Sequence, residues 1–245
     1  MDLIGLTVVG GATVLLLVLA RFRRGFFAHY REIPGLSRLL RAFGLSVEDG
    51  KRLMVALGSQ SLLTRNAGAA LAGLGLLRAV SAKAAVSDRP PVAVTGDPAV
   101  ALLAQASIHS AFRAAGATEF FQPVSGRLTG LTPFSSAAAS MPILHDEGVS
   151  VAVLLGQFGP EAALLADAAN RSEALLIGGT GDLAGQSVLY ATASELLLGE
   201  ELFAAPALTG GSPASSASLA VQDVLRWAAV LGLIIGVALK LLGII

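Results

Sequence analysis

Short apolar runs alternate with longer Ala- and Leu-rich stretches along most of this chain. The short runs have the length of buried strands, and the longer stretches have the length of helices. Parallel strands need helix-sized crossover connections, so the alternation predicts a mostly parallel sheet covered by helices on both faces. We therefore expect a Rossmann-like three-layer α/β domain over residues 51–205. Its strands are expected at residues 52–57, 91–95, 126–131, 149–155 and 174–178, with a possible sixth at 187–193.

The expected helices follow these runs, and Pro142 is expected to interrupt the helical stretch after the third run. Residues 21–50 are basic and predict a helical neck, with Pro34-Gly35 as a break. Residues 206–218, which contain "TGGSPASSAS", are typical of a Gly/Ser-rich linker.

Both ends of the chain are strongly apolar. Residues 3–20 carry no charge, and Lys240 is the only charged residue between 227 and 245. A membrane-spanning helix needs about 20 predominantly apolar residues, so we expect transmembrane helices over 3–20 and 219–245. A secretory signal peptide is the alternative for the first, and a buried globular helix is the alternative for the second.

Basic residues predict the orientation of these spans. Residues 21–52 hold eight Lys and Arg residues against three acids. Lys and Arg are enriched in cytoplasmic segments next to spans. The pattern places both termini outside and the α/β head in the cytoplasm.

Composition narrows the chemistry. The chain is 54% hydrophobic and 14% charged, against about 25% charged in a soluble domain, so part of it is expected to face lipid. The net charge is +0, which argues against a nucleic-acid partner because such partners require a basic surface. The chain has no cysteine, and its three histidines lie far apart, so no metal site is expected. The cofactor is left unknown.

Ligands of open parallel sheets bind beyond the carboxyl ends of the strands. The turns expected there are rich in small and polar residues. The ligand-binding candidates in them are Gly58, Ser59, Ser61, Gly96, Asp97, Gly156, Gln157, Phe158, Glu161, Thr180 and Asp182.

The same residue types also serve ordinary turns and helix caps, which explains most of these positions without a ligand. Gln157 and Phe158 are the two that turn geometry does not explain, and they suggest a contact. The sequence contains no GxxxxGK[ST], GxGxxG or GxSxG motif, although "GGTGD" is weakly glycine-rich. No catalytic residue is assigned, and an acidic pair such as Asp97 with Glu161 stays open.

Ala228, Gly232 and Gly236 recur at four-residue spacing in the last apolar segment. Small residues at this spacing let two membrane helices approach closely. The pattern predicts either self-association or packing against the first span, where Gly10 and Gly11 offer a flat surface.

Several pieces of the sequence resemble a family of uncharacterised bacterial two-span membrane proteins that carry a domain of unknown function. The most specific are "GDP", "FGPEA" and "GEELFAA", and the likeness extends from about residue 30 to the final span. The family has a more glycine-rich loop at residues 58–63, which weakens a phosphate-binding interpretation here. The resemblance implies the topology and the fold, and a bacterial inner membrane, but no activity.

Two functional hypotheses follow. The first is a non-enzymatic, membrane-anchored scaffold that forms homo-oligomers or binds an unidentified protein partner. The second is a small-molecule sensor or enzyme, for a nucleotide-like ligand or a metabolite, that uses the crevice at the carboxyl ends of the strands.

Overall fold

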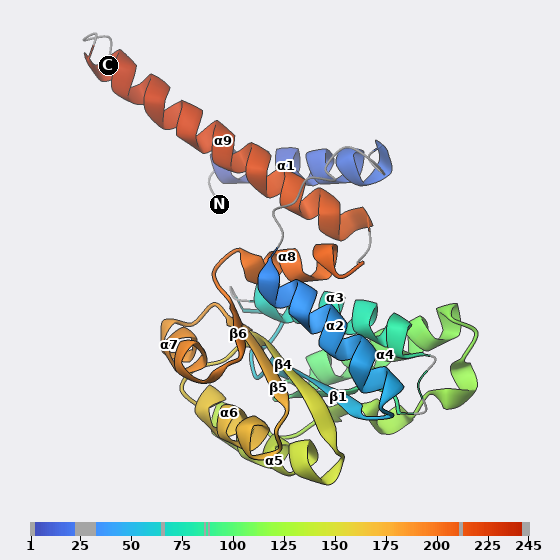
Figure 1. The fold of residues 1–245 in the computed structure, drawn as a ribbon. Helices are drawn as coiled ribbons and strands as arrows, with labels where there is room; N and C mark the ends of the chain where they lie inside the picture. The colour runs from blue at the N-terminus through green and yellow to red at the C-terminus, as the bar shows by residue number, and fades with distance from the viewer. Residues whose placement is uncertain are drawn as a thin grey trace. The chain divides into compact units, whose positions relative to one another are not determined.

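The chain forms two compact units in a computed structural model that describes residues 3–22, 33–64, 67–85, 87, 89–210 and 213–241. The larger unit extends from Arg31 to Gly211 and contains the sheet (Figure 1). The second unit combines the two ends of the chain, Met1–Tyr30 and Ser212–Ile245.

The larger unit is built on a parallel sheet of six strands within the described residues. In spatial order the strands run β3-β2-β1-β4-β5-β6, and each neighbouring pair is parallel. This is the order of a doubly wound α/β domain. Strands β1 to β3 are added toward one edge of the sheet and β4 to β6 toward the other, so the strand order reverses between β1 and β4. The predicted parallel α/β fold is therefore confirmed. The strands are β1 (Arg52–Gly58), β2 (Val92–Thr95), β3 (Gly126–Leu128), β4 (Val149–Gln157), β5 (Leu175–Thr180) and β6 (Glu195–Leu197).

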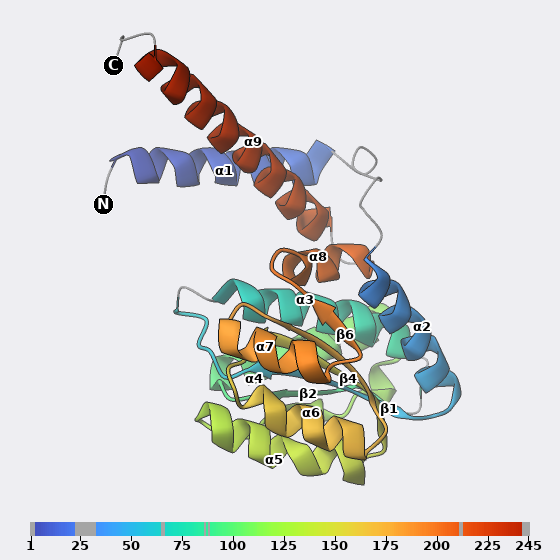
Figure 2. The same ribbon diagram turned by 60° about the vertical axis from the view of Figure 1, so that its left-hand side comes forward.

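Helices cover both faces of this sheet, giving the three layers seen in Figure 2. One face carries α2 (Pro34–Glu48), α3 (Ala67–Ala84), α4 (Pro98–Ala114) and α8 (Glu201–Leu208). The other carries α5 (Pro133–Asp146), α6 (Ala162–Arg171) and α7 (Leu183–Thr192). Two short 3₁₀ turns, η1 (Thr118–Phe120) and η2 (Pro123–Ser125), lead into β3.

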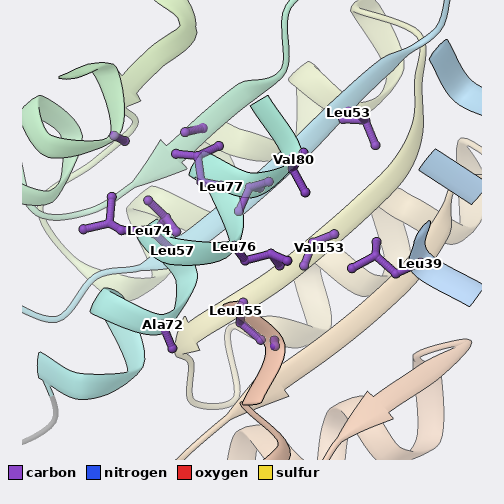
Figure 3. Close-up of a cluster of buried hydrophobic side chains, with 14 of the residues drawn as sticks. Leu39, Leu53, Leu57, Ala72, Leu74, Leu76, Leu77, Val80, Val153 and Leu155 are labelled. Carbon is purple, nitrogen blue, oxygen red and sulfur yellow. The ribbon is translucent and has the colours of Figure 1, made fainter. Parts of the chain in front are cut away.

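Alternation along each central strand supplies both cores. In β1, Leu53, Val55 and Leu57 point to one face, and Met54 and Ala56 point to the other. Figure 3 shows the first of these cores, where Leu53 and Leu57 lie among side chains of α3 and β4. Because both faces are buried, the strands are continuous apolar runs, which is the signal that the sequence carries.

Two predicted details of the head are wrong. The possible sixth strand at residues 187–193 does not form, because residues 187–192 lie in α7, and the last strand is the short β6. Val188, Tyr190 and Thr192 are residue types that favour strands, which is why the sequence also allows a strand there. Pro142 does not interrupt α5, which continues to Asp146 with Ile143 and Leu144 buried against the sheet.

Of the segment predicted as a neck, residues 33–50 belong to the head, and residues 23–32 lie outside the described residues. Pro34 is the first residue of α2, a position where a missing N–H costs nothing, so it starts a helix. Leu36, Leu39 and Phe43 of α2 are buried in the same core as α3. Much of the predicted linker is helical as well, because α8 ends at Leu208 and α9 (Pro213–Leu241) begins soon after it.

The small residues of α3 allow close packing on both of its sides. A Cβ at Gly73 would lie 2.3 Å from the Leu155 carbonyl oxygen of the sheet, and one at Gly75 would lie 2.8 Å from Pro206 of α8. This apolar helix has the length and composition of a membrane span, but 61% of it is buried in the head. It is a core helix of the α/β unit.

The terminal unit contains α1 (Leu3–Phe22) and α9, which pack against each other. Residues Ala214–Leu241 of α9 are long and apolar enough to cross a membrane, and none of the most apolar 18-residue window within them is buried. The apolar stretch described in α1, Leu6–Val18, is shorter. Added Cβ atoms at Gly10, Gly11, Gly232 and Gly236 would meet nothing within 4 Å, so the contact between α1 and α9 does not run through these glycines.

Candidate functional site

The carboxyl ends of β1 and β4 approach each other more closely than side chains permit. A Cβ at Gly156 would lie 2.2 Å from the Leu57 carbonyl oxygen. Gly58 has a φ of +77°, and a Cβ there would lie 2.4 Å from the Gln157 carbonyl oxygen. Both positions therefore require glycine for the path of the backbone, with no need of a ligand.

Gly96, at the end of β2, is required for a similar reason. A Cβ at this position would lie 2.6 Å from the Cβ of Ser59 in the loop after β1. The Thr95 hydroxyl and the Gly96 N–H both donate hydrogen bonds to the Gly58 carbonyl oxygen, at 2.7 and 3.0 Å. These contacts tie the ends of β1 and β2 together.

Two of the three predicted acidic residues are helix caps. The Asp97 carboxylate accepts a hydrogen bond of 2.9 Å from the Val100 N–H at the start of α4. The Asp182 carboxylate accepts bonds from the N–H groups of Ala184 and Gly185 at the start of α7. Such bonds satisfy the otherwise unpaired N–H groups of a helix terminus. Neither carboxylate lines the crevice that Glu161 lines.

Thr180 and Phe158 hold the loop after β4 in place. The Phe158 N–H donates to the Thr180 hydroxyl, and that hydroxyl donates to the Phe158 carbonyl oxygen, each at 2.9 Å. The Phe158 ring is 4% exposed and belongs to the core on the α5–α6 face. Core packing thus explains the apolar side chain at this position, and Phe158 also lines the crevice described below.

The remaining predicted loop residues have local roles. Gly178 and Gly179 lie inside β5, where added Cβ atoms would meet Leu189 and Leu155, so "GGTGD" is not a phosphate-binding loop. The Gln157 amide oxygen lies beside Gly181 of the neighbouring loop. Ser61 begins a turn in which its carbonyl oxygen accepts a bond from the Thr64 hydroxyl.

One small crevice is left between these loops and the first turns of α5 and α6. Its volume is about 10 Å³, which is about the space that one water molecule needs. Ligand pockets for small organic molecules typically enclose about 300–1,000 Å³. A nucleotide does not fit this space. The lining residues are Ala56, Gly58, Ser59, Val94, Pro133, Ser136, Ala137, Ser140, Phe158, Glu161 and Leu165.

Glu161 is the charged residue of this crevice, and it is 5% exposed. Its Oε1 accepts a hydrogen bond of 2.8 Å from the Gly159 N–H. The side chain makes no cap bond to α6, since carbonyl oxygens of the preceding turn already accept the first N–H groups of that helix. Among the described residues, Glu161 has no cationic partner.

Three hydroxyl residues beside Glu161 were not predicted as site residues. The Ser140 hydroxyl donates to the Ser136 carbonyl oxygen at 2.7 Å, and the Ser136 and Thr129 hydroxyls lie 2.9 Å apart. Ser136 and Ser140 line the crevice from α5. Their four-residue spacing places them on one helix face, which was the available signal in "SSAAASMP".

A second polar cluster, also unpredicted, lies at the opposite edge of the sheet. Glu147 precedes β4 and accepts hydrogen bonds from Arg52 of β1 and Arg127 of β3. Burial alone would raise the pKa of Glu147, but the two guanidinium groups outweigh burial and lower it. Arg52 also donates to the Gln122 side chain at 3.3 Å. These residues come from segments that are far apart in sequence, so no local sequence motif predicts the cluster.

Comparison with known families identifies the chain. A family model described as a domain of unknown function, DUF6754, matches residues 2–245. The chain belongs to the DUF6754 family. No curated protein and no solved structure gives a significant match. Within the described residues, no group of three His, Cys, Asp or Glu side chains is placed to hold a metal ion.

Proposed function

We propose that this DUF6754 protein is a non-enzymatic, membrane-anchored scaffold whose α/β heads assemble with other copies. The observation that carries the anchoring is the surface of α9. Large apolar side chains lie exposed all around this helix, and such a surface is stable in lipid but not in water. They include Val224, Leu225, Trp227, Val230, Leu231, Leu233, Ile234, Ile235 and Val237.

The terminal helix α1 is proposed as the second membrane segment. Its exposed side chains include Leu6, Val9 and Leu17, and it packs against α9. The excess of Lys and Arg in residues 21–52 favours a cytoplasmic head with both termini outside. A bacterial inner membrane is the setting that agrees with this arrangement.

The residues of the head favour a scaffold over a small-molecule enzyme. Asp97 and Asp182 are used as helix caps, and Phe158 is used in the core. The crevice they were expected to form is smaller than a nucleotide needs. A sensor or enzyme for nucleotide-like ligands is therefore the weaker hypothesis.

The proposed contact between copies uses the small-residue face of α9. Ala228 is exposed, and Gly232 and Gly236 have open space where a side chain would stand. Two helices that meet through such a face gain backbone packing that larger side chains prevent.

Cross-linking and light scattering of the purified chain in detergent test self-association. Ala228→Leu is expected to reduce the oligomer at least several-fold, and Ala229→Leu, one position around the helix, is the matched control. A wild-type chain that is only monomeric, or equal effects of both variants, contradicts assembly through this face.

Topology is tested separately with single cysteines, because the natural chain has none. Cysteines placed at residue 2 and at residue 245 are expected to react with a membrane-impermeant reagent in intact cells. A cysteine at exposed Glu119 is expected to react only after lysis. The reverse pattern overturns the orientation. Screening nucleotides by thermal shift tests the weaker hypothesis.

A further inference from the structure

The crevice between α5 and α6 contains a buried carboxylate that the fold leaves incompletely paired. Glu161 is only 5% exposed. Its side chain accepts a single hydrogen bond and has no cationic neighbour among the described residues. Its Oε2 atom accepts no hydrogen bond from that part of the chain, and it is not among the fully buried polar atoms, so it retains contact with solvent. An unpaired buried charge is costly, because the interior replaces the water that would solvate it.

The other polar groups of the crevice offer acceptors. The Ser140 hydrogen is directed to the Ser136 carbonyl oxygen, and the Thr129 hydroxyl donates to the Thr95 carbonyl oxygen at 3.3 Å. The Ser136 and Thr129 hydroxyls share a hydrogen bond in which either can donate, and the Ser140 hydroxyl lies 3.0 Å from the Thr129 hydroxyl. The oxygen atoms of Ser136 and Ser140 keep lone pairs, and no described residue shares a hydrogen bond with the Ser59 hydroxyl.

We propose that the Glu161 crevice binds one monovalent cation, held by the Glu161 carboxylate and the hydroxyl oxygens of Ser59, Ser136 and Ser140. A single positive charge neutralises the single carboxylate. Calcium sites usually draw on several carboxylates, and no such group lies among the described residues. The limited volume also selects a small ion over an organic ligand.

The competing explanation is that helix termini alone neutralise Glu161. The first turns of α5 and α6 both border the crevice, and a helix N-terminus carries roughly half a positive charge. However, the N–H groups of the α6 first turn are bonded to backbone carbonyl oxygens, and Thr132 caps α5. The Phe134 N–H of α5 is left without an acceptor among the described residues, but it makes no hydrogen bond to Glu161.

The test measures thermal unfolding of the full chain in detergent at constant ionic strength, in KCl, NaCl, NH₄Cl or choline chloride. Choline is too large for the crevice and serves as the reference cation. At about ten times its Kd, a bound cation is expected to raise the midpoint by roughly 3–5 °C over choline. The three salts separate a metal ion from an ammonium group.

Glu161→Gln keeps the side-chain size and removes the charge, so it is expected to abolish the difference between salts. Glu119→Gln, at an exposed position of η1, is expected to keep it. Equal midpoints of the wild-type chain in all four salts overturn the proposal, as does a Glu161→Gln variant that responds like wild type.

Ser140→Ala keeps the proposal testable if Glu161→Gln does not fold. Loss of one ligand oxygen is expected to raise the half-saturating concentration of the preferred cation several-fold. An unchanged concentration excludes Ser140 from the site and contradicts the proposed ligand set. Soaking wild-type crystals with Tl⁺ gives an independent readout, because its anomalous signal is expected beside Glu161, and its absence there contradicts the site.

Discussion

Two acidic residues flank β4, and they differ in whether a positively charged side chain pairs with them. Glu147 precedes the strand and is bonded by Arg52 and Arg127, so its charge is compensated within the protein. Glu161 follows the strand, is more deeply buried, and has one backbone donor. The same strand thus begins at a carboxylate that is paired with two guanidinium groups, although the Arg52 Nε atom there has no hydrogen-bond partner, and it ends at a carboxylate without a counter-charge.

This difference distinguishes a carboxylate whose charge is neutralised within the protein from a carboxylate that can still bind a positively charged ligand. A buried ion pair whose members satisfy each other stabilises the local packing and offers little to an outside group. A buried carboxylate without a counter-charge raises the energy of the fold unless something else supplies that charge. The carboxyl edge of the sheet is therefore the better place to look for a ligand, even though its crevice is small.

The largest expected effect comes from breaking the strand contact that shapes the carboxyl edge. In Gly156→Ala the new methyl group would lie 2.2 Å from the Leu57 carbonyl oxygen, and neither backbone can yield without disturbing the sheet. We expect a loss of about 3 kcal/mol or more in unfolding free energy, by denaturant titration followed with far-ultraviolet circular dichroism. Gly44→Ala in α2 is the control. A Cβ there meets nothing within 4 Å, so it is expected to be neutral or stabilising by up to about 1 kcal/mol.

The next largest effect comes from removing the charge at the amino edge. Glu147→Gln leaves Arg52, whose side chain is 14% exposed, and Arg127 without their shared partner. Breaking a fully buried pair costs about 3–5 kcal/mol, and partial exposure here reduces the expectation to about 2–3 kcal/mol. The same titration measures it. A loss no larger than that of exposed Glu119→Gln would mean that solvent already screens the cluster.

The same residue predicts a pH dependence. The pKa of Glu147 is lowered in the folded state from its ordinary value of 4.5. Its stabilising contribution is therefore complete above that ordinary value and is lost as the pH falls through the lowered folded pKa. Between pH 7 and acid pH, the wild-type chain is expected to lose more stability than Glu147→Gln. Parallel pH profiles of the two proteins would contradict this assignment.

A smaller effect is expected at the cap of α7. Asp182→Ala removes the acceptor for two N–H groups and is expected to cost about 1 kcal/mol. The response to K⁺ should stay unchanged, because this carboxylate lies outside the crevice. Asp182→Asn keeps an acceptor oxygen and is the matched control. An altered cation response in Asp182→Ala would mean that the two loops are coupled.

The sequence predicted the sheet well because strands buried on both faces are continuous apolar runs. It did not predict the helix at residues 187–192. In the short helix α7 only Gly185 and Leu189 are buried, which is too few to give a helical pattern of apolar residues. Gly58, Gly96 and Gly156 were correctly placed at the carboxyl edge, but their cause is the close approach of strands. That cause depends on distances between segments that no single loop reveals.

The candidate site was only partly predictable for the same reason. Glu161 and Ser59 were placed together because the carboxyl ends of parallel strands share one edge. Ser136 and Ser140 were missed because they lie inside a helix, where serine carries no distinctive local signal. The Arg52, Arg127 and Glu147 cluster was missed because strand order, and not sequence spacing, brings these residues together.

The smallest expected effect sharpens the comparison most. In choline chloride, Glu161→Gln is expected to change the unfolding free energy by less than about 1 kcal/mol in either direction. The variant removes an uncompensated charge and keeps an oxygen that accepts from the Gly159 N–H. The measurement is the titration used for Glu147→Gln, so the two sides of β4 are compared in one protein under one condition. A loss as large as that of Glu147→Gln would mean that the fold itself compensates Glu161. The contrast between the two carboxylates would then disappear, and with it the reason to expect a ligand at this edge.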